Sequence, residues 1–395
     1  MRYLSADVIF PIHKPLIING ILIIDENGII IDLLDPAIDE ISDSLPVEKF
    51  EGILCPGFVN AHCHLELSHL KGKFAQGKGL PYFIKEIITN RDAKEEEILQ
   101  AITWADAEMY ESGIVAVGDI SNSATTLTQK RSSKIYYHTF VEIFDISSDR
   151  AAETFDKGKI LQHIFLEAGQ NASISPHATY SVSQSLLKLI SDYVEKSGSL
   201  LSIHNQETES ENEMFVRGTG ALFERLRQQT NAFSDWKPEG KTSLSTLIGI
   251  LNLNSPMQLV HNTFTGINDI RLALSNQRNF YWCLCVNANL FIENTLPDIR
   301  LLSQEGCKIT VGTDSYASNT SLSVLDELKT INNNYPEIDL AEILKWATLN
   351  GSDFLKQEKK YGSFEIGKMP GINNITKIGK EDLRLNSASR LIKIY

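Results

Sequence analysis

Apolar and polar residues along this chain follow two periods, which alternate through most of its length. Continuous apolar runs, typical of buried strands, are separated by segments in which apolar residues recur as on one face of a helix. The runs predict strands over 53–62, 113–120, 135–144, 171–177, 200–204, 257–262, 280–286 and 308–314. The segments between them predict helices over 95–110, 184–197, 243–253 and 341–349.

Strands that alternate with helices in this way predict an α/β fold of the (β/α)8, or TIM-barrel, type. The two ends of the chain differ, with shorter strand patterns separated by Gly and Pro turns. These patterns cover residues 6–10, 20–24, 28–32 and 390–395. We expect the ends, residues 1–52 and 363–395, to meet as one small composite β domain beside a barrel formed by residues 53–362.

The first predicted barrel strand ends in two histidines, His62 and His64. Residues at i and i+2 of a strand point to the same face, so both imidazoles can approach one point, as a metal ion requires. By itself a His-x-His pair is a weak signal, because surface strands also carry such pairs. The other strand ends therefore test the hypothesis.

Polar residues follow four further strands of the predicted barrel. His177 ends the fourth strand, and His204 and Glu207 follow the fifth. His261 ends the sixth strand, and Asp314 follows the eighth. Because the carboxyl ends of barrel strands surround one opening, we expect these side chains to converge on a single site.

Imidazole nitrogens with a carboxylate are ligands suited to zinc and leave a coordination position open for water. The candidate metal ligands are His62, His64, His204 and Asp314. Glu207 is close enough in sequence to His204 to contact that water as a proton shuttle without being a ligand. His261 is a candidate for orienting the water or stabilising charge at the reacting centre.

Three of these residues also have a structural alternative. His177 follows a proline and fits an ordinary loop, His261 alone is typical of a packed core, and Asp314 after Gly-Thr fits a helix N-cap. Further carboxylates alternate beyond Glu207 and are expected to form a solvated face: Glu209, Glu211 and Glu213. No cluster surrounds the remaining histidines, to which we assign no role: His13, His69, His138 and His163.

The overall composition and charge disfavour two classes of protein, those that bind nucleic acid and those that bind membranes. The chain has 395 residues, of which 42% are hydrophobic and 22% charged, as in ordinary globular proteins. Its net charge of −13 would repel nucleic acid or an anionic membrane, so neither is expected as a partner. We find no signal peptide pattern and no apolar run of about 20 residues. The five cysteines predict buried thiols in a cytoplasmic protein.

Taken together, the motifs resemble those of the amidohydrolase superfamily, in its nucleobase and nucleoside deaminase branch. The matching segments are Pro-Gly-Phe-Val-Asn-Ala-His-Cys-His at 56–64, His-Asn-Gln-Glu at 204–207, His261, and Gly-Thr-Asp-Ser at 312–315. Asn-Gly at 350–351 and Phe-Glu-Ile-Gly-Lys at 364–368 match the usual exit of that family into its small β domain. The resemblance covers nearly the whole chain.

The resemblance implies one divalent ion, zinc as first choice with iron or manganese as alternatives, held by the four candidate ligands. It implies that metal-bound hydroxide attacks an amino-bearing ring carbon while Glu207 moves protons and Asp314 accepts one. His261 would contact the attacking water and His177 the substrate. Two-metal members carry a bridging carbamylated lysine on strand four, and this chain has none there, so we predict a single ion.

Two further segments resemble the aminodeoxyfutalosine deaminases of menaquinone biosynthesis: His-Leu-Glu-Leu-Ser at 64–68 and Phe-Ile-Lys-Glu-Ile-Ile at 83–88. Where related deaminases place a Glu on the ribose, this chain has Arg91, a planar partner for a carboxylate such as the benzoate of aminodeoxyfutalosine. The alternative for Arg91 is a helix-end cation that answers the helix dipole. Glu66 is a second candidate substrate ligand, or simply the start of a loop.

Three functions remain open at this point. The first is a metal-dependent hydrolytic deaminase of an amino-purine nucleoside, with 6-amino-6-deoxyfutalosine as the best candidate. The second is a deaminase or chlorohydrolase of another N-heterocycle: guanine, cytosine, a triazine, adenosine or S-adenosylhomocysteine. The third, a non-catalytic ligand-binding barrel, is disfavoured because the ligand and shuttle positions are complete. The resemblance also implies a homodimer, and the loop-rich segment 205–242 is a candidate lid.

Overall fold

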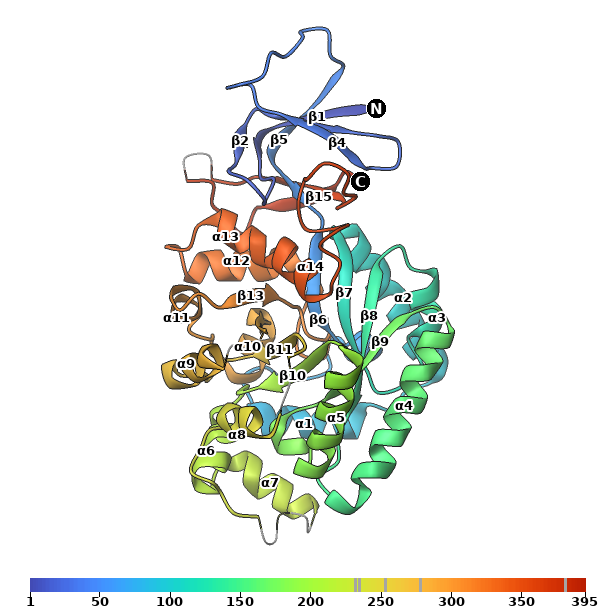
Figure 1. Ribbon diagram of the computed structural model, residues 1–395, viewed down its shortest axis with the longest axis vertical. Helices are drawn as coiled ribbons and strands as arrows, with labels where there is room; N and C mark the ends of the chain where they lie inside the picture. The colour runs from blue at the N-terminus through green and yellow to red at the C-terminus, as the bar shows by residue number, and fades with distance from the viewer. Residues whose placement is uncertain (231–232, 234–235, 252–253, 277–278, 380–381) are drawn as a thin grey trace.

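Eight parallel strands form the barrel in two halves, β6-β7-β8-β9 and β10-β11-β12-β13 (Figure 1). The computed structural model describes residues 1–230, 233, 236–251, 254–276, 279–379 and 382–395. The strand bounds are Phe58–Cys63 (β6), Ile114–Ser121 (β7), Tyr136–Ile143 (β8), Asn171–Pro176 (β9), Leu201–Asn205 (β10), Met257–His261 (β11), Phe280–Leu284 (β12) and Lys308–Val311 (β13). Isolated parallel bridges, Ala178 to His204 and Cys63 to Asp314, link the halves. The predicted barrel fold is confirmed.

The apolar runs predicted the strands well because parallel strands are buried on both faces and need no polar alternation. Each of the seven later strands begins within one residue of its predicted start. The first predicted strand, 53–62, is wrong in one respect, since it is two strands. β5 (Val47–Pro56) belongs to the small sheet, β6 begins at Phe58, and the small sheet therefore extends past the predicted boundary at residue 52.

Gly57 separates the two strands for a steric reason. A Cβ at this position would lie 2.3 Å from Cγ1 of Val115 and 2.7 Å from the carbonyl oxygen of Pro370. Only glycine fits where two segments approach so closely. The break is invisible in the hydrophobic pattern because the residues on both sides of it are buried.

The two ends of the chain share one seven-stranded sheet at one end of the barrel (Figure 1). Its order is β15-β14-β5-β1-β3-β4, with β2 paired to β1. The bounds not yet given are Arg2–Ile9 (β1), Ile17–Ile18 (β2), Ile21–Ile24 (β3), Ile30–Leu34 (β4), Ile372–Thr376 (β14) and Arg390–Lys393 (β15). The division of the chain into two domains stays a prediction.

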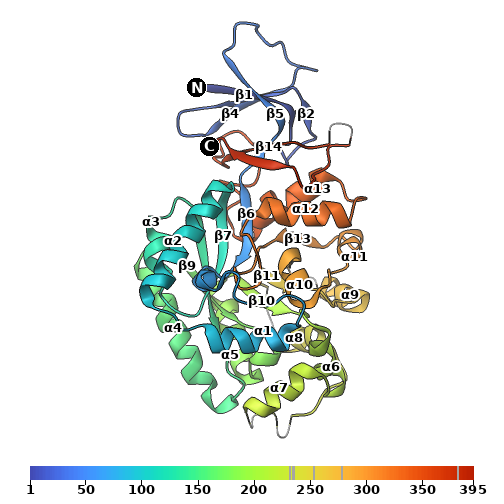
Figure 2. The same cartoon turned by 180° about the vertical axis from the view of Figure 1, so that it is seen from behind.

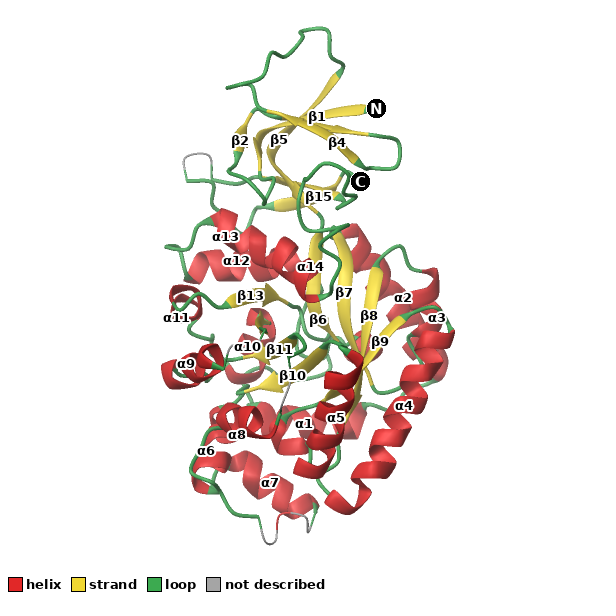
Figure 3. Ribbon diagram, viewed as in Figure 1, coloured by secondary structure: helices red, strands yellow, loops and turns green. Residues whose placement is uncertain are grey.

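Helices surround the barrel strands (Figure 3). Their bounds are Leu80–Asn90 (α1), Glu95–Glu111 (α2), Leu127–Ser132 (α3), Ala151–Glu167 (α4), Gln184–Ser197 (α5), Glu209–Arg217 (α6), Ala221–Gln229 (α7), Ser243–Ile250 (α8), Ile267–Ser275 (α9), Val286–Glu293 (α10), Ile299–Gln304 (α11), Val324–Asn334 (α12), Leu340–Lys345 (α13) and Gly351–Phe354 (α14). Short 3₁₀ turns cover Leu65–Leu70, Ser148–Arg150 and Thr179–Ser181, and a π turn covers Trp346–Asn350.

Three of the four predicted helices can be compared in full with the structure. The helices over 95–110 and 184–197 are present as α2 and α5. The segment 341–349 is α13 followed by the π turn. The prediction over 243–253 is met by α8 as far as Ile250, and residues 252–253 lie outside the described residues.

The helices α1 and α7 lie at the end of the barrel away from the small sheet (Figures 1 and 2). This is the end at which the barrel strands finish, so both helices are placed to wall the site. The lid predicted over 205–242 includes α6 and α7, and its residues 231–232 and 234–235 lie outside the described residues; the lid stays a prediction. Among the helices that the structure describes, none combines the length and the apolar character needed to cross a membrane.

Candidate metal and substrate site

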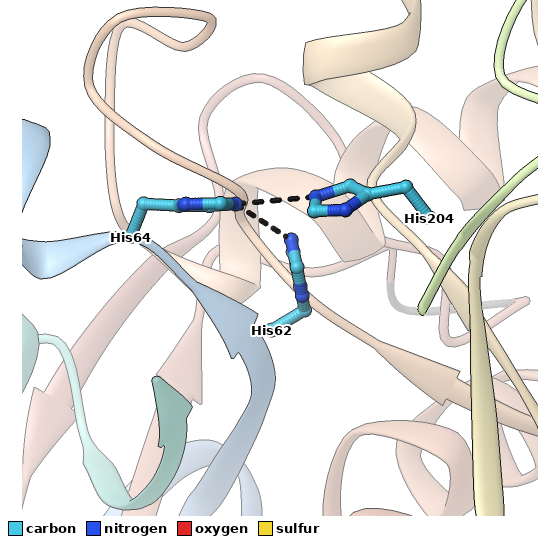
Figure 4. Close-up of side chains that lie close together, drawn as sticks. All are labelled: His62, His64 and His204. Atoms are coloured by element: carbon cyan, nitrogen blue, oxygen red, sulfur yellow. Dashed lines mark hydrogen bonds between the residues drawn. The ribbon is translucent and has the colours of Figure 1, made fainter. Parts of the chain in front are cut away.

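Three histidines converge at the ends of β6 and β10 (Figure 4). Nε2 of His64 lies 3.2 Å from Nε2 of His62 and 3.3 Å from Nε2 of His204. Oδ1 of Asp314 lies 3.6 Å from Nε2 of His62 and 3.4 Å from Nε2 of His64. Donor atoms about 2.0–2.1 Å from a tetrahedral zinc ion would be about 3.3–3.4 Å apart. The structure therefore brings the four predicted ligands together at the spacing that one such ion requires.

Hydrogen bonds tie the first and the last barrel strand together beneath these ligands. The backbone N–H groups of Thr313 and Asp314 both donate to the carbonyl oxygen of His62, at 3.0 and 3.1 Å. The amide of Asn60 donates to Oγ1 of Thr313 at 2.7 Å. Asp314 takes a left-handed φ of 56°, which turns its side chain off the strand. It caps no described helix, since α12 begins only at Val324, so the N-cap alternative is wrong.

Burial favours the neutral form of four histidines at this site: His62, His64, His177 and His261. Burial lowers the pKa of His62 to about 3 and that of His177 to about 4, and it also lowers the pKa of His64 and His261. Nδ1 of His204 donates to the carbonyl oxygen of His177 at 2.9 Å, which leaves the lone pair on Nε2. Neutral imidazoles with free lone pairs are the form that binds a metal ion.

Glu207 lies next to this cluster, with its carboxyl opposite His261. Oε1 of Glu207 is 3.6 Å from Nε2 of His261. Nδ1 of His261 donates to Oδ1 of Asn289 at 2.9 Å, so Nε2 is the acceptor nitrogen. Burial raises the pKa of Glu207 well above its usual value, which favours the protonated carboxyl. A protonated carboxyl in this position can deliver a proton and take one back. Asn289 had no predicted role.

Glu211 is not part of a solvated face, and that expectation is wrong. Its side chain is fully buried in the first turn of α6, while Glu209 is exposed and Glu213 is half-buried. Oε2 of Glu211 accepts the backbone N–H of Glu207 at 3.3 Å. The N–H groups before a helix have no partner within the helix, and a carboxylate in the first turn satisfies them. Glu211 therefore holds the turn that carries Glu207.

This contact makes Glu211 a positioning residue with a testable effect. We expect Glu211→Ala to lower kcat about 10–100-fold with little change in KM, because small displacements of a catalytic group cost rates of this order. Glu211→Gln keeps an acceptor oxygen and should retain most of the activity. Steady-state kinetics on both variants check this, and equal losses in the two would show that the acceptor is not what matters.

A cavity of about 440 Å³ opens beside the cluster, within the size range of small-molecule sites. His177, Glu207 and His261 line its inner part, and Nδ1 of His177 donates to Oγ of Ser181 at 2.7 Å. The outer wall is largely apolar and comes from α1, α7 and the loop after β8: Leu80, Phe83, Ile84, Ile87, Phe144 and Leu226. The cavity therefore extends beyond the candidate ligands and Glu207, and we call the part bounded by these apolar side chains its apolar extension.

Arg91 lines the apolar extension and is held by neighbours. Its guanidinium is hydrogen-bonded to the carboxylate of Glu66 and, at 3.1 Å, to Oδ1 of Asn122. Arg91 is also the C-cap of α1, in agreement with the helix-end alternative, and its contact with a substrate carboxylate stays a prediction. Glu66 is buried and is not among the described residues that line the cavity; its carboxylate supports Arg91 instead.

Glu142 at the end of β8 was missed by the sequence analysis. It is buried, lines the cavity, and lies with His177 and His204 in a second group of side chains that could hold a metal ion. The signal was present, since a single carboxylate interrupts the apolar run predicted as the third strand. Glu142 was not singled out because no histidine stands beside it at the end of this strand.

Comparison with known proteins agrees with this geometry. The amidohydrolase family matches residues 53–383. An adenosine deaminase of Helicobacter pylori is 28% identical over 316 residues, which cover 79% of this chain and 76% of the relative. An aminodeoxyfutalosine deaminase of Nitratiruptor sp. is 27% identical over 372 residues, which cover 88% and 86%. The crystal structure of H. pylori aminofutalosine deaminase with methylthio-coformycin has a TM-score of 0.80 at 24% identity, covering 95% of this chain and 92% of that one.

The chain belongs to the amidohydrolase family. Members of this family bind a divalent metal, and the donor set described above fits one, because neutral imidazoles and a carboxylate are the ligands such ions prefer. The resemblance inferred from the motifs is confirmed, and so is the predicted enzyme class, a hydrolytic deaminase. The third alternative, a non-catalytic barrel, is thereby set aside.

Proposed function

We propose that this protein is a metal-dependent hydrolytic deaminase of an amino-purine nucleoside, with 6-amino-6-deoxyfutalosine as its best substrate. The observation that carries the proposal is one continuous cavity with the two features that such a reaction needs. At its inner end lie Glu207 and three of the four candidate ligands, His64, His204 and Asp314, with His62 directly behind them. At its outer end lies Arg91, bonded to Glu66 and Asn122 and next to the apolar side chains of the cavity wall. The names of the matched deaminases support it.

A divalent ion, with zinc as first choice, would be held by His62, His64, His204 and Asp314 and would act as a Lewis acid that makes water nucleophilic near neutral pH. Glu207 delivers its proton to the ring nitrogen next to the amino-bearing carbon. Nε2 of His261 accepts from the reacting centre and stabilises charge there. Asp314 accepts a proton from the water. As the new C–O bond forms, Asp314 passes this proton on to the amino group, the C–N bond breaks and ammonia leaves, and the proton of the new hydroxyl returns to Glu207 as the carbonyl forms.

The outer end of the cavity supports the choice of substrate. An adenosine-like nucleoside with its amino group at the cluster would extend its 5′ substituent along α1. A benzoate in that place would meet the apolar side chains with its ring and the guanidinium of Arg91 with its carboxylate. In a chain of net charge −13, a bound anion needs such a local cation. Adenosine itself is the second candidate, because an adenosine deaminase is among the relatives.

The test is ammonia release by the metal-loaded enzyme from aminodeoxyfutalosine, adenosine, S-adenosylhomocysteine, guanine and cytosine. We expect aminodeoxyfutalosine to be the best substrate. Arg91→Gln should lower its kcat/KM about 10–100-fold, the value of a charged hydrogen bond, and change that of adenosine less than about threefold.

Arg150, the other arginine that lines the cavity, offers the matched control. Arg150→Gln should leave the preference for aminodeoxyfutalosine in place. If Arg150→Gln instead lowers kcat/KM selectively for aminodeoxyfutalosine, then Arg150 rather than Arg91 binds the carboxylate of the substrate. No ammonia from any nucleoside would refute the proposed function.

A further inference from the structure

Glu142 lines the cavity and carries a buried carboxylate oxygen that lacks a partner within the described part of the chain. Its side chain is nine-tenths buried, and its Oε2 accepts from Nδ2 of Asn122 at 3.0 Å. Its Oε1 is buried and has no hydrogen-bond partner among the described residues. Leaving a buried carboxylate oxygen without a donor is unfavourable, so a donor is expected from whatever enters the cavity.

Two internal explanations for Glu142 do not fit the geometry. The first is support for His204, but Oε1 lies 3.6 Å from Nδ1 of His204, whose hydrogen already goes to the carbonyl oxygen of His177. The second is a further metal ion held by Glu142, His177 and His204. Nδ1 of His204 donates to that carbonyl and Nε2 of the same ring faces His64, so His204 has no nitrogen left for such an ion.

The position of Glu142 restricts the donor to one part of the substrate. Glu142 faces Nδ1 of His204, whereas the ligand cluster faces Nε2 across the same ring. It therefore meets a part of the substrate beyond the reacting carbon. In an adenine ring the remaining nitrogens are acceptors, which a carboxylate cannot bind. The next donors along an adenosine-like nucleoside are its sugar hydroxyls.

We propose that Glu142 accepts a hydrogen bond from a sugar hydroxyl and makes the enzyme selective for hydroxylated nucleosides over deoxynucleosides. The inference rests on the proposed function and adds the residue that recognises the sugar. Asn122 links this contact to the outer end of the cavity, since its Nδ2 donates to Glu142 and its Oδ1 accepts from Arg91. The side-chain amide of Asn122 is therefore bonded both to Glu142, the proposed acceptor for the sugar, and to Arg91.

The test compares kcat/KM on adenosine, 2′-deoxyadenosine and 3′-deoxyadenosine. For the wild type we expect loss of the recognised hydroxyl to cost about 10–100-fold, as for other charged hydrogen bonds. Glu142→Met, which has no acceptor oxygen, should show less than about a threefold difference between these substrates. Glu142→Gln, with a neutral acceptor, should show an intermediate difference and also serves if the Met variant does not fold.

Glu327 supplies the matched control, because its carboxylate is buried but is not among the described cavity-lining groups. Glu327→Gln should keep the wild-type discrimination. If the wild type treats the three nucleosides alike, or if the Glu142 variants discriminate as the wild type does, the inference is overturned while the deaminase activity stands. If the wild type deaminates no nucleoside, the proposed function fails and the inference fails with it.

Discussion

Glu207→Gln is expected to lower kcat for deamination by about 10²–10⁴-fold while leaving metal content and KM nearly unchanged. The Glu207 side chain is buried against His261, and burial raises its pKa, which favours a proton that glutamine cannot transfer. The amide has the same shape and can still hydrogen-bond. Steady-state ammonia release, together with metal analysis of the purified variant, measures both parts of this prediction.

Glu211→Gln provides the comparison for Glu207→Gln. Both substitutions replace a buried carboxyl by an amide of the same shape, but only Glu207 faces His261. The loss should therefore be large for Glu207 and small for Glu211. Similar kinetics in the two variants, or a Glu207→Gln enzyme within about tenfold of the wild type, would rule out Glu207 as the proton shuttle.

Lys130→Met is expected to cause the largest loss of stability, about 3–5 kcal/mol in the free energy of unfolding. The side chains of Lys130 and Asp119 are fully buried, with Nζ 2.6 Å from Oδ2. Nζ also donates to the hydroxyls of Ser121 and Thr139, at 3.1 and 2.9 Å. Removing the ammonium group leaves the carboxylate of Asp119 buried without a cation, and that uncompensated charge is the source of the cost.

The same substitution should weaken metal binding. Oδ1 of Asp119 accepts the backbone N–H of Leu65 at 2.7 Å, immediately after His64. A carboxylate released from Lys130 would disturb this turn and the imidazole that precedes it. Urea unfolding at neutral pH and metal titration of the folded variant measure the two effects.

Two controls separate the buried charge from other consequences of Lys130→Met. The double variant Asp119→Asn with Lys130→Met removes both charges and should recover at least half of the lost stability. Arg271→Met breaks an exposed pair with Glu305 and should cost less than about 1 kcal/mol. A Lys130→Met protein as stable as the Arg271→Met protein would contradict the prediction.

The sequence by itself determined the alternation of strands and helices and the place of the chemistry at the strand ends. Continuous apolar runs could be assigned to strands because each barrel strand is buried on both faces. His62 and His64 could be assigned to one face because the side chains of a strand alternate. The remaining ligands followed from the rule that the strands of a barrel end around a single opening.

Only the tertiary structure decided which contacts form between segments far apart in the chain. The spacing of His62 and Asp314 depends on the bonds between the first and last barrel strands, and the break at Gly57 depends on Val115 and Pro370. Glu211 and Glu142 likewise have buried surroundings that come from distant elements. Whether a carboxylate is solvated, positions a neighbour or lines a cavity depends on what packs around it in space, and the local sequence pattern does not contain that information.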